Sequence, residues 1–358
     1  MDGKLFTPIR IGTMECRNRL VRSATYTYAG QKDGTISQKQ IDLHARLANH
    51  GVGCIITEHF CVSYPDGLAA DDQCGLYDDR FISGLSTLVE AVERHDCRLI
   101  VQLGHSGAQN KSSAMNCLLL LAPSPIEVLP GRPARAMTLD EIRALPDAYA
   151  KAAARAKQAG DTGVQLHCAH DYLMSAFLTP SLNHREDSYG GTRENRLRLP
   201  LETLMAIRSA VGTDYPVFIK INATVAEDPG TYLDDLIYYL DALYREGLTA
   251  AELSGADFTK HRFGDGVYYL TQAQRIKERT ACPLIVTGGM RSPFELEEAL
   301  SGGADMVGIS RPLICEPDIV REWSAGNMIR STCVSCNRCF KLPRESGQYC
   351  IRHQTKML

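Results

Sequence analysis

Short apolar runs alternate with helical patterns along the chain, and this alternation limits the possible folds more than any other feature. Eight runs are nearly continuous in Val, Ile and Leu, which is typical of strands that are covered on both faces. They lie at residues 20–24, 54–58, 99–103, 164–168, 217–222, 250–254, 284–287 and 306–310.

Amphipathic helical patterns separate these runs. Apolar residues recur with i, i+3, i+4 and i+7 spacing over 85–92, and with the same spacing over 233–243. Thr138 followed by Glu141 predicts a capping box that opens a helix ending near Gly160. A strand followed by a helix, repeated eight times in 358 residues, predicts a (β/α)8 TIM barrel rather than an open doubly wound sheet.

Three segments depart from this repeat. Residues 5–18 precede the first strand and are expected to form an N-terminal hairpin that closes the barrel floor. Residues 104–137 form a long connection after the third strand, at the barrel face where active sites are built. We place the barrel at residues 1–330 and a short cysteine-rich extension at residues 331–358.

Composition narrows the class of protein. The net charge is −3, with acidic and basic residues interspersed, so neither nucleic acid nor a membrane is expected as a partner. The N-terminus lacks the apolar stretch of a signal peptide. Thirteen cysteines then indicate a reducing, cytoplasmic setting. The nine from Cys16 to Cys315 are expected to act as small core hydrophobes.

Polar side chains follow most of the predicted strands. Because the carboxyl ends of barrel strands surround one mouth, we expect the residues there to face a single pocket. In chain order the residues at these strand ends are Ser23, Ala24, Thr25, Glu58, His59, Gln102, His167, His170, Lys220, Ser254, Gly255, Gly288, Gly289, Ser310 and Arg311.

The last two strand ends have the chemistry of an anion site. Gly288 and Gly289 precede a helix that begins near Ser292, and Ser310 and Arg311 end the eighth strand. Glycine lets backbone N–H groups approach a phosphate, and arginine can hold it with two donors. The alternative is a tight turn beside a surface arginine. Position in the repeat favours the phosphate site.

The fourth strand ends in two histidines and a tyrosine, which suit a polar ligand. His167, His170 and Tyr172 are compatible with a metal, but no third ligand of matching character is evident. They also suit a carbonyl oxygen polarised by two N–H donors, with a phenol as proton donor.

These residues belong to a longer pattern that resembles the signature of the old yellow enzyme family. The pattern runs over 4–325 and includes Leu5-Phe6-Thr7-Pro8, Asn18-Arg19, Ser23-Ala24-Thr25, Gln102-Leu103-Gly104-His105, His167-Cys168-Ala169-His170-Asp171-Tyr172, Phe177-Leu178-Thr179-Pro180, Asn183, Arg185, Asp187, Tyr189-Gly190-Gly191, Glu194-Asn195-Arg196 and Gly308–Arg311. Within the family, the chain is most similar to barrels of the 2,4-dienoyl-CoA reductase and trimethylamine dehydrogenase branch.

The resemblance implies an FMN-dependent ene-reductase that is reduced by NADH or NADPH. By similarity, Ser23, Ala24, Thr25 and His59 lie near the flavin ring, Gln102 binds its pyrimidine edge, and Lys220 lies near N1. Gly288, Gly289, Ser310 and Arg311 hold the phosphate. His167 and His170 bind the substrate carbonyl, and Tyr172 protonates the α-carbon after hydride transfer from flavin N5 to the C=C bond.

Some residues depart from the family pattern. Asp171 stands where the family usually has glycine, and Tyr26 and His59 are larger or more polar than the common residues near the flavin. These departures bear on the choice of substrate, which we expect to be a small enone-type molecule bound by a homo-oligomer.

The extension carries four thiols at Cys333, Cys336, Cys339 and Cys350. The spacing resembles that of the [4Fe–4S] ligands in the branch named above, and thiolates at such spacing also suit zinc. Free or disulfide-linked structural cysteines are the third reading.

Two other functions remain open. An amine dehydrogenase of the trimethylamine type would oxidise an amine at the same flavin, although that branch tends to place tyrosine where His167 stands. A non-enzymatic flavin redox or electron-transfer protein would use the cysteine-rich extension.

Overall fold

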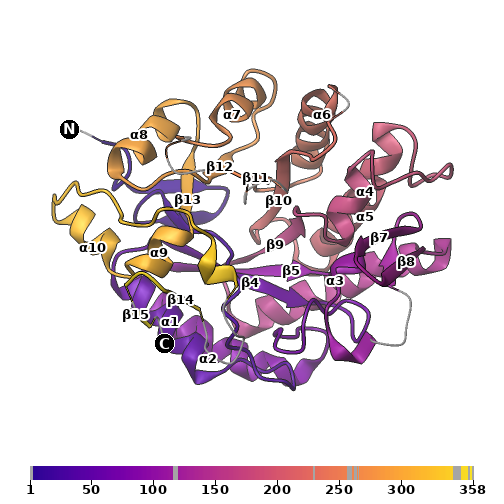
Figure 1. Ribbon diagram of the computed structural model, residues 1–358, viewed down its shortest axis with the longest axis horizontal. Coiled ribbons are helices and arrows are strands. Elements are labelled where there is room, and N and C mark those ends of the chain that lie inside the picture. Colours follow the sequence, from indigo (N-terminus) through magenta and orange to yellow (C-terminus); the bar gives the residue numbers. More distant parts are fainter. Residues whose placement is uncertain are drawn as a thin grey trace.

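The eight predicted strands pair in chain order and close into one parallel barrel (Figure 1). The computed structural model describes residues 3–115, 120–228, 230–255, 260–261, 264, 266–341, 348–353 and 355–356. The barrel strands are β3 (Leu20–Arg22), β4 (Cys54–Cys61), β5 (Arg98–Gly104), β9 (Gly163–Cys168), β10 (Val217–Thr224), β11 (Ala250–Gly255), β12 (Leu284–Thr287) and β13 (Met306–Ile309). The predicted TIM barrel is therefore confirmed.

Nearly every strand residue is buried because side chains fill the barrel on one face and helices cover the other. The covering helices are α1 (Gln38–Asn49), α2 (Ile82–Glu93), α3 (Leu139–Ala159), α5 (Arg193–Val211), α6 (Tyr232–Arg245), α7 (Leu270–Lys277) and α8 (Pro293–Ser301). Thr138 and Glu141 form the predicted capping box at the start of α3, and Gly160 ends that helix with a φ of 93°.

A hairpin closes the floor of the barrel, as predicted. Its strands, β1 (Ile9–Ile11) and β2 (Met14–Cys16), are antiparallel. Ile11, Met14 and Cys16 pack with Val21, Ile100, Phe218 and other residues at the amino ends of the barrel strands. This packing leaves the carboxyl ends of the strands as the open mouth.

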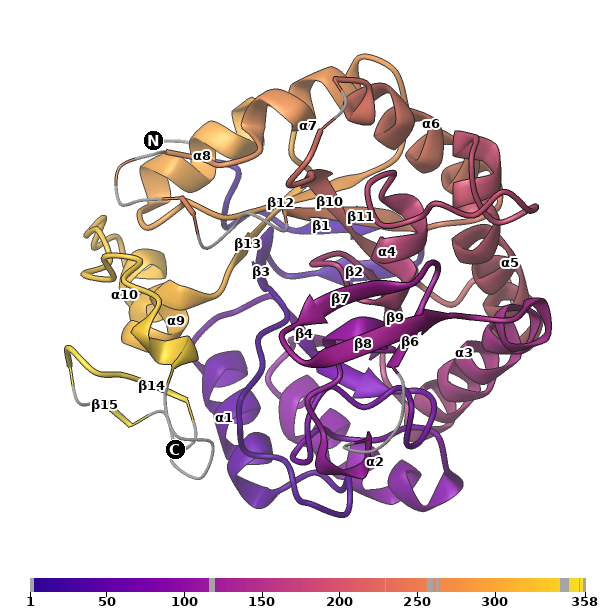
Figure 2. The ribbon, with the colours of Figure 1, turned by 45° about the vertical axis from the view of Figure 1, so that its right-hand side comes forward.

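The long connection after β5 contains a small sheet that the sequence did not predict. Its strands are β6 (Leu120–Ala122), β7 (Ile126–Leu129) and β8 (Arg132–Ala136), and Figure 2 shows β7 and β8 side by side. Arg185 ties the sheet to the barrel because its guanidinium donates to the carbonyls of Pro123 and Met137. The strands are short, and proline lies inside the last of them, which explains the weak sequence signal.

Three short α-helices complete the described α-helices, and the cysteine-rich extension follows the last of them. These are α4 (Leu173–Leu178), α9 (Arg311–Cys315) and α10 (Ile319–Ser324). The extension includes β14 (Tyr349–Cys350) and β15 (Thr355–Lys356), and β14 packs beside α9. The Ser331 N–H donates to the Arg291 carbonyl at 2.7 Å, so the extension lies against the barrel.

Eight of the nine scattered cysteines are buried, as expected for small core hydrophobes, and Cys117 lies outside the described residues. Within the part of the chain that the structure describes, no helix is both long and apolar enough to cross a membrane.

Candidate active site

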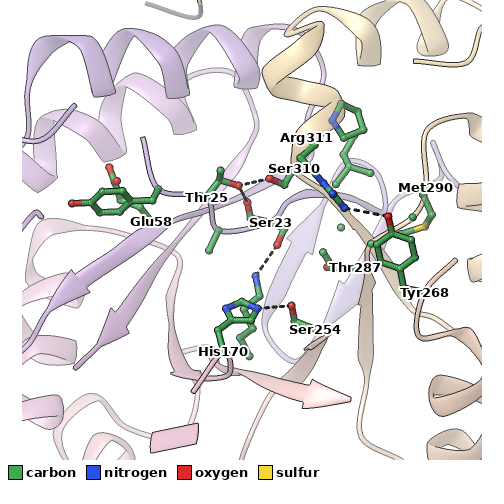
Figure 3. Close-up of a pocket in the computed structure, with 18 of the residues that line it drawn as sticks. Ser23, Thr25, Glu58, His170, Ser254, Tyr268, Thr287, Met290, Ser310 and Arg311 are labelled. Atoms are coloured by element: carbon green, nitrogen blue, oxygen red, sulfur yellow. Dashed lines mark hydrogen bonds between the residues drawn. The ribbon is translucent and has the colours of Figure 1, made fainter. Parts of the chain in front are cut away.

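One cavity of about 260 Å³ lies at the carboxyl ends of the barrel strands. Every residue predicted to be catalytic or cofactor-binding lines it: Ser23, Ala24, Thr25, His59, Gln102, His167, His170, Tyr172, Lys220, Gly288, Gly289, Ser310 and Arg311. Figure 3 shows His170 and Ser254 at one part of the cavity and Arg311 with Tyr268 at another. The fold thus brings together predicted residues that are up to 288 positions apart, from Ser23 to Arg311.

The turn after β9 places His170 and Tyr172 on the cavity wall, and two of its residues have left-handed backbone. His170 and Asp171 have φ values of 61° and 58°. The Asn222 amide oxygen accepts from the His170 N–H at 3.0 Å and holds this turn. Glycine adopts left-handed backbone at the lowest cost, so an aspartate at position 171 is conformationally disfavoured.

Three imidazoles and a phenol form one contiguous wall. Ring centroids lie 5.6 Å apart for His59 and His167, 5.2 Å for His167 and His170, and 4.7 Å for His167 and Tyr172. Burial lowers the pKa of His59 to about 4 and that of His170 to about 3, with the Lys220 charge adding to both shifts. Burial likewise holds the pKa of His167 well below its ordinary value, helped by the neighbouring histidines. All three rings are therefore neutral at pH 7 and can each donate one N–H.

Two nitrogens of this wall fit a bound ligand. His59 Nε2 and His167 Nδ1 are buried and have no hydrogen-bond partner among the described residues. Buried polar atoms are normally satisfied, so a bound group that brings donors or acceptors to this wall would complete them. The residues present therefore fit a ligand with a polar edge, such as a flavin ring.

The floor of the cavity carries a buried ion pair. Lys220 Nζ lies 3.1 Å from Glu252 Oε1 and donates to Ser23 Oγ at 2.8 Å. The sequence reasoning missed Glu252. A signal was available, because Glu252 precedes Ser254 by two residues on β11, and alternate strand residues point to the same face.

The far end of the cavity fits a phosphate. Gly288 and Gly289 have φ values of 114° and 85°, and a Cβ on Gly289 would lie 1.7 Å from the Gly266 carbonyl oxygen. Only glycine suits such backbone. Arg311 reaches this end, where it donates to the Tyr268 hydroxyl at 3.3 Å and to Asn337 Oδ1 at 2.8 Å.

Further lining residues were missed because they lie outside the strand ends. Arg291 donates to the Gly289 carbonyl at 2.8 Å and to the Ser335 hydroxyl. Ser335 and Phe340 come from the cysteine-rich extension, and Tyr268 precedes α7. No strand pattern points to these positions.

The four thiols of the extension line a second, smaller cavity together with Arg311. Over the described parts of the chain, however, no three His, Cys, Asp or Glu side chains are placed to hold a metal ion. The donor chemistry suits a metal, whereas the arrangement of the side chains does not converge on one.

Comparison with known proteins identifies the family. The model of the NADH:flavin oxidoreductase / NADH oxidase family matches residues 4–327. The chain belongs to this family. The predicted old yellow enzyme relationship is confirmed, and FMN is the cofactor.

Two curated relatives show how much of the chain is shared. An NADH oxidase of Thermoanaerobacter brockii is 34% identical over 93% of this chain, which spans only 52% of that protein. An NADPH dehydrogenase of Bacillus velezensis is 32% identical over 90% of this chain and 94% of its own length. The chain thus spans about half of the first relative and nearly all of the second.

Solved structures agree with the fold. The old yellow enzyme homologue from Zymomonas mobilis has a TM-score of 0.80 at 26% identity, covering 91% of this chain and 94% of that chain. The 6-hydroxypseudooxynicotine amine oxidase of Pseudomonas geniculata N1 has a TM-score of 0.83 at 26% identity, covering 94% of this chain and 51% of that chain.

Proposed function

We propose that the protein takes hydride from NADH or NADPH and reduces the C=C bond of an α,β-unsaturated carbonyl compound. The observation that carries the proposal is the wall of buried imidazoles beside Tyr172, on the same cavity as Gly288, Gly289 and Arg311. When bound, FMN would supply the redox chemistry that carries hydride between the nicotinamide and the substrate.

His167 and His170 would bind the substrate through its carbonyl oxygen. Neutral imidazoles donate one N–H each, and two donors on one oxygen stabilise the enolate that forms when the β-carbon is reduced. Tyr172 stands next to His167, with ring centroids 4.7 Å apart, so its hydroxyl is the group to protonate the α-carbon.

The remaining lining residues would position the cofactor. Gly288, Gly289, Ser310 and Arg311 suit its phosphate, since they combine open backbone N–H groups with a guanidinium. Ser23, Ala24, Thr25 and His59 would border the ring, with Gln102 at the pyrimidine edge and Lys220 near N1. The Lys220 ammonium would favour the reduced, negatively charged ring.

A turnover assay with a histidine variant tests the proposal. FMN-loaded wild type should consume a cyclic enone such as cyclohexenone with NAD(P)H, whereas His167→Ala should lose about 100-fold or more in kcat/KM. His105→Ala is the matched control, because His105 is buried outside the cavity and pairs with Asp66. Unchanged enone turnover in His167→Ala would show that the carbonyl does not bind there.

Amine oxidation is the second candidate, favoured by the similarity to the amine oxidase. His167 stands against it, because the amine-oxidising branch tends to have tyrosine at that position. Anaerobic mixing of the oxidised protein with tertiary amines, without NAD(P)H, separates the two. Bleaching of the flavin absorbance by the amine would favour this candidate.

The thiol array stays a prediction. Cys333, Cys336, Cys339 and Cys350 line one cavity, and the three candidates for this array are a [4Fe–4S] cluster, a zinc ion and free thiols. Iron, sulfide and zinc analysis of anaerobically purified protein distinguishes them. We also expect a homo-oligomer, which sedimentation would measure.

A further inference from the structure

A buried carboxylate, Glu252, lies one layer beneath the residues that line the cavity. It is fully buried on β11 and faces its register partner Lys220 on β10. Its carboxylate oxygens meet donors from four strands or strand ends: Lys220, Ser23, Thr287 and Gln165. No single strand pair could make such a set, so the carboxylate ties these strands together beneath the cavity.

The contacts split between the two carboxylate oxygens. Oε1 accepts from the Ser23 hydroxyl at 2.5 Å and the Thr287 hydroxyl at 2.8 Å, and lies 3.1 Å from Lys220 Nζ. Oε2 accepts from Gln165 Nε2 at 2.8 Å. A buried charge with this many donors is satisfied where it stands. Burial alone would raise the pKa of Glu252. The Lys220 charge and these hydrogen bonds lower that pKa by more than burial raises it, so the pKa lies below its ordinary value and the carboxyl group is ionised.

The carboxylate also sets the direction of a chain of amides. A carboxylate only accepts, so Gln165 must turn its Nε2 toward Glu252 and its Oε1 away. Gln102 Nε2 then donates to Gln165 Oε1 at 2.7 Å. This order leaves Gln102 Oε1 as the group available to accept from a ligand N–H in the cavity, as the N3–H of a flavin pyrimidine ring requires.

We propose that Glu252 is a positioning residue that holds Lys220 and Gln102 in place for the flavin and offsets the Lys220 charge, which keeps the flavin reduction potential low. The inference rests on the proposed placement of the FMN ring above Lys220. A lone ammonium beneath the ring would favour the negatively charged reduced form, whereas a neutral pair favours it much less. The potential is therefore set by the pair and not by Lys220 alone.

The test is a redox titration of the FMN-loaded full chain, which needs no enone substrate. Glu252→Gln keeps the shape and removes the charge, so the ratio of affinities for reduced and oxidised FMN should rise about tenfold or more. A tenfold change corresponds to about 30 mV upward for a two-electron couple. Gln165→Leu is the matched control, because it breaks the amide chain and keeps the ion pair. Its FMN binding should weaken while the potential stays at the wild-type value.

A paired variant keeps the test decisive if Glu252→Gln does not fold. Replacing a buried ion pair by neutral residues of similar shape is often tolerated, so Lys220→Met/Glu252→Gln should fold. The flavin reduction potential of this double variant should lie close to the wild-type value. The potential of the single variant Lys220→Met should be lower than that of the wild type. Either of two results would overturn the proposal. One is a double variant whose flavin reduction potential is as low as that of Lys220→Met, and the other is a Glu252→Gln potential that equals or lies below the wild-type value. If the protein fails to turn over enones, the proposed function is contradicted. The reduction potentials would still test the role of Glu252, because they are measured without an enone.

Discussion

The Nε2 atom of His170 lies 2.8 Å from the Ser254 hydroxyl, so the imidazole at the exit of β9 is tied to the end of β11, two strands further around the barrel. This hydrogen bond holds the imidazole ring of His170 in one orientation. The backbone of His170 itself is left-handed. Orientation of the proposed carbonyl-binding group therefore depends on a side chain outside the predicted catalytic set.

Removal of that hydroxyl should reduce enone turnover while leaving the cofactor bound. We expect Ser254→Ala to lower kcat/KM for an enone roughly threefold to tenfold, the value of one neutral hydrogen bond. Steady-state kinetics with the FMN content measured in parallel checks this. Ser254→Thr keeps the hydroxyl and is the matched control. Equal kcat/KM in wild type and Ser254→Ala would show that the hydrogen bond does not orient His170 for catalysis.

Acid should destabilise the protein in a window set by its buried histidines. Burial lowers the pKa of His44 and His59 to about 4, and that of His170 to about 3, in the folded state. Unfolded histidine has a pKa of about 6.5. Between these values the unfolded chain binds more protons, so the free energy of unfolding falls as the pH drops from about 6.5 toward 4. Above about pH 6.5 the histidines are neutral in both states, so their full contribution to the free energy of unfolding is present.

Thermal or urea unfolding at pH values from 8 to 4 measures this dependence. His59→Gln removes one of the titrating groups, so its stability should fall less steeply with acid than that of the wild type. A wild-type stability that stays constant from pH 7 to pH 4 would contradict the neutral, buried state of these rings.

The barrel and most of the site were predictable because both follow from periodicity along single strands. Strand β12 has the predicted bounds, Leu284–Thr287, since an apolar run between turn residues marks both of its ends. His167 and Lys220 both lie at strand ends, and the carboxyl ends of barrel strands surround one mouth. Their common location could therefore be predicted without knowing the loops.

Other residues of the site could not be found in this way. Ser335 and Phe340 reach the cavity from the extension, and Arg291 is placed by hydrogen bonds to Gly289 and Ser335. These positions are set by the tertiary packing of segments whose sequence has no repeating pattern, so the sequence alone does not reveal them. The sheet of β6, β7 and β8 was missed for a similar reason, because strands this short carry almost no period-two signal.

The contact between the extension and Arg311 predicts a link to cofactor affinity. Asn337 has a φ of 57° and accepts from Arg311 at 2.8 Å. Asn337→Gly removes the acceptor and suits the backbone, so the Kd for FMN should rise roughly threefold to tenfold. Titration of apoprotein with FMN, followed by flavin fluorescence, measures it. Arg338→Ala, an exposed change in the same segment, should leave the Kd unaltered. A Kd that is the same in Asn337→Gly and wild type would show that Arg311 needs no support from the extension.

The left-handed backbone at Asp171 makes opposite predictions for two substitutions. Burial raises the pKa of Asp171, and its φ is 58°, so both the charge and the conformation are disfavoured there. Glycine removes both costs, and Asp171→Gly should raise the free energy of unfolding by about 1 kcal/mol. A β-branched residue clashes at positive φ, so Asp171→Val should lower it by about 2 kcal/mol. Chemical denaturation of the two variants at pH 7 measures both values. If Asp171→Gly proves less stable than the wild type, the carboxylate must make a compensating interaction that outweighs the strain of the turn.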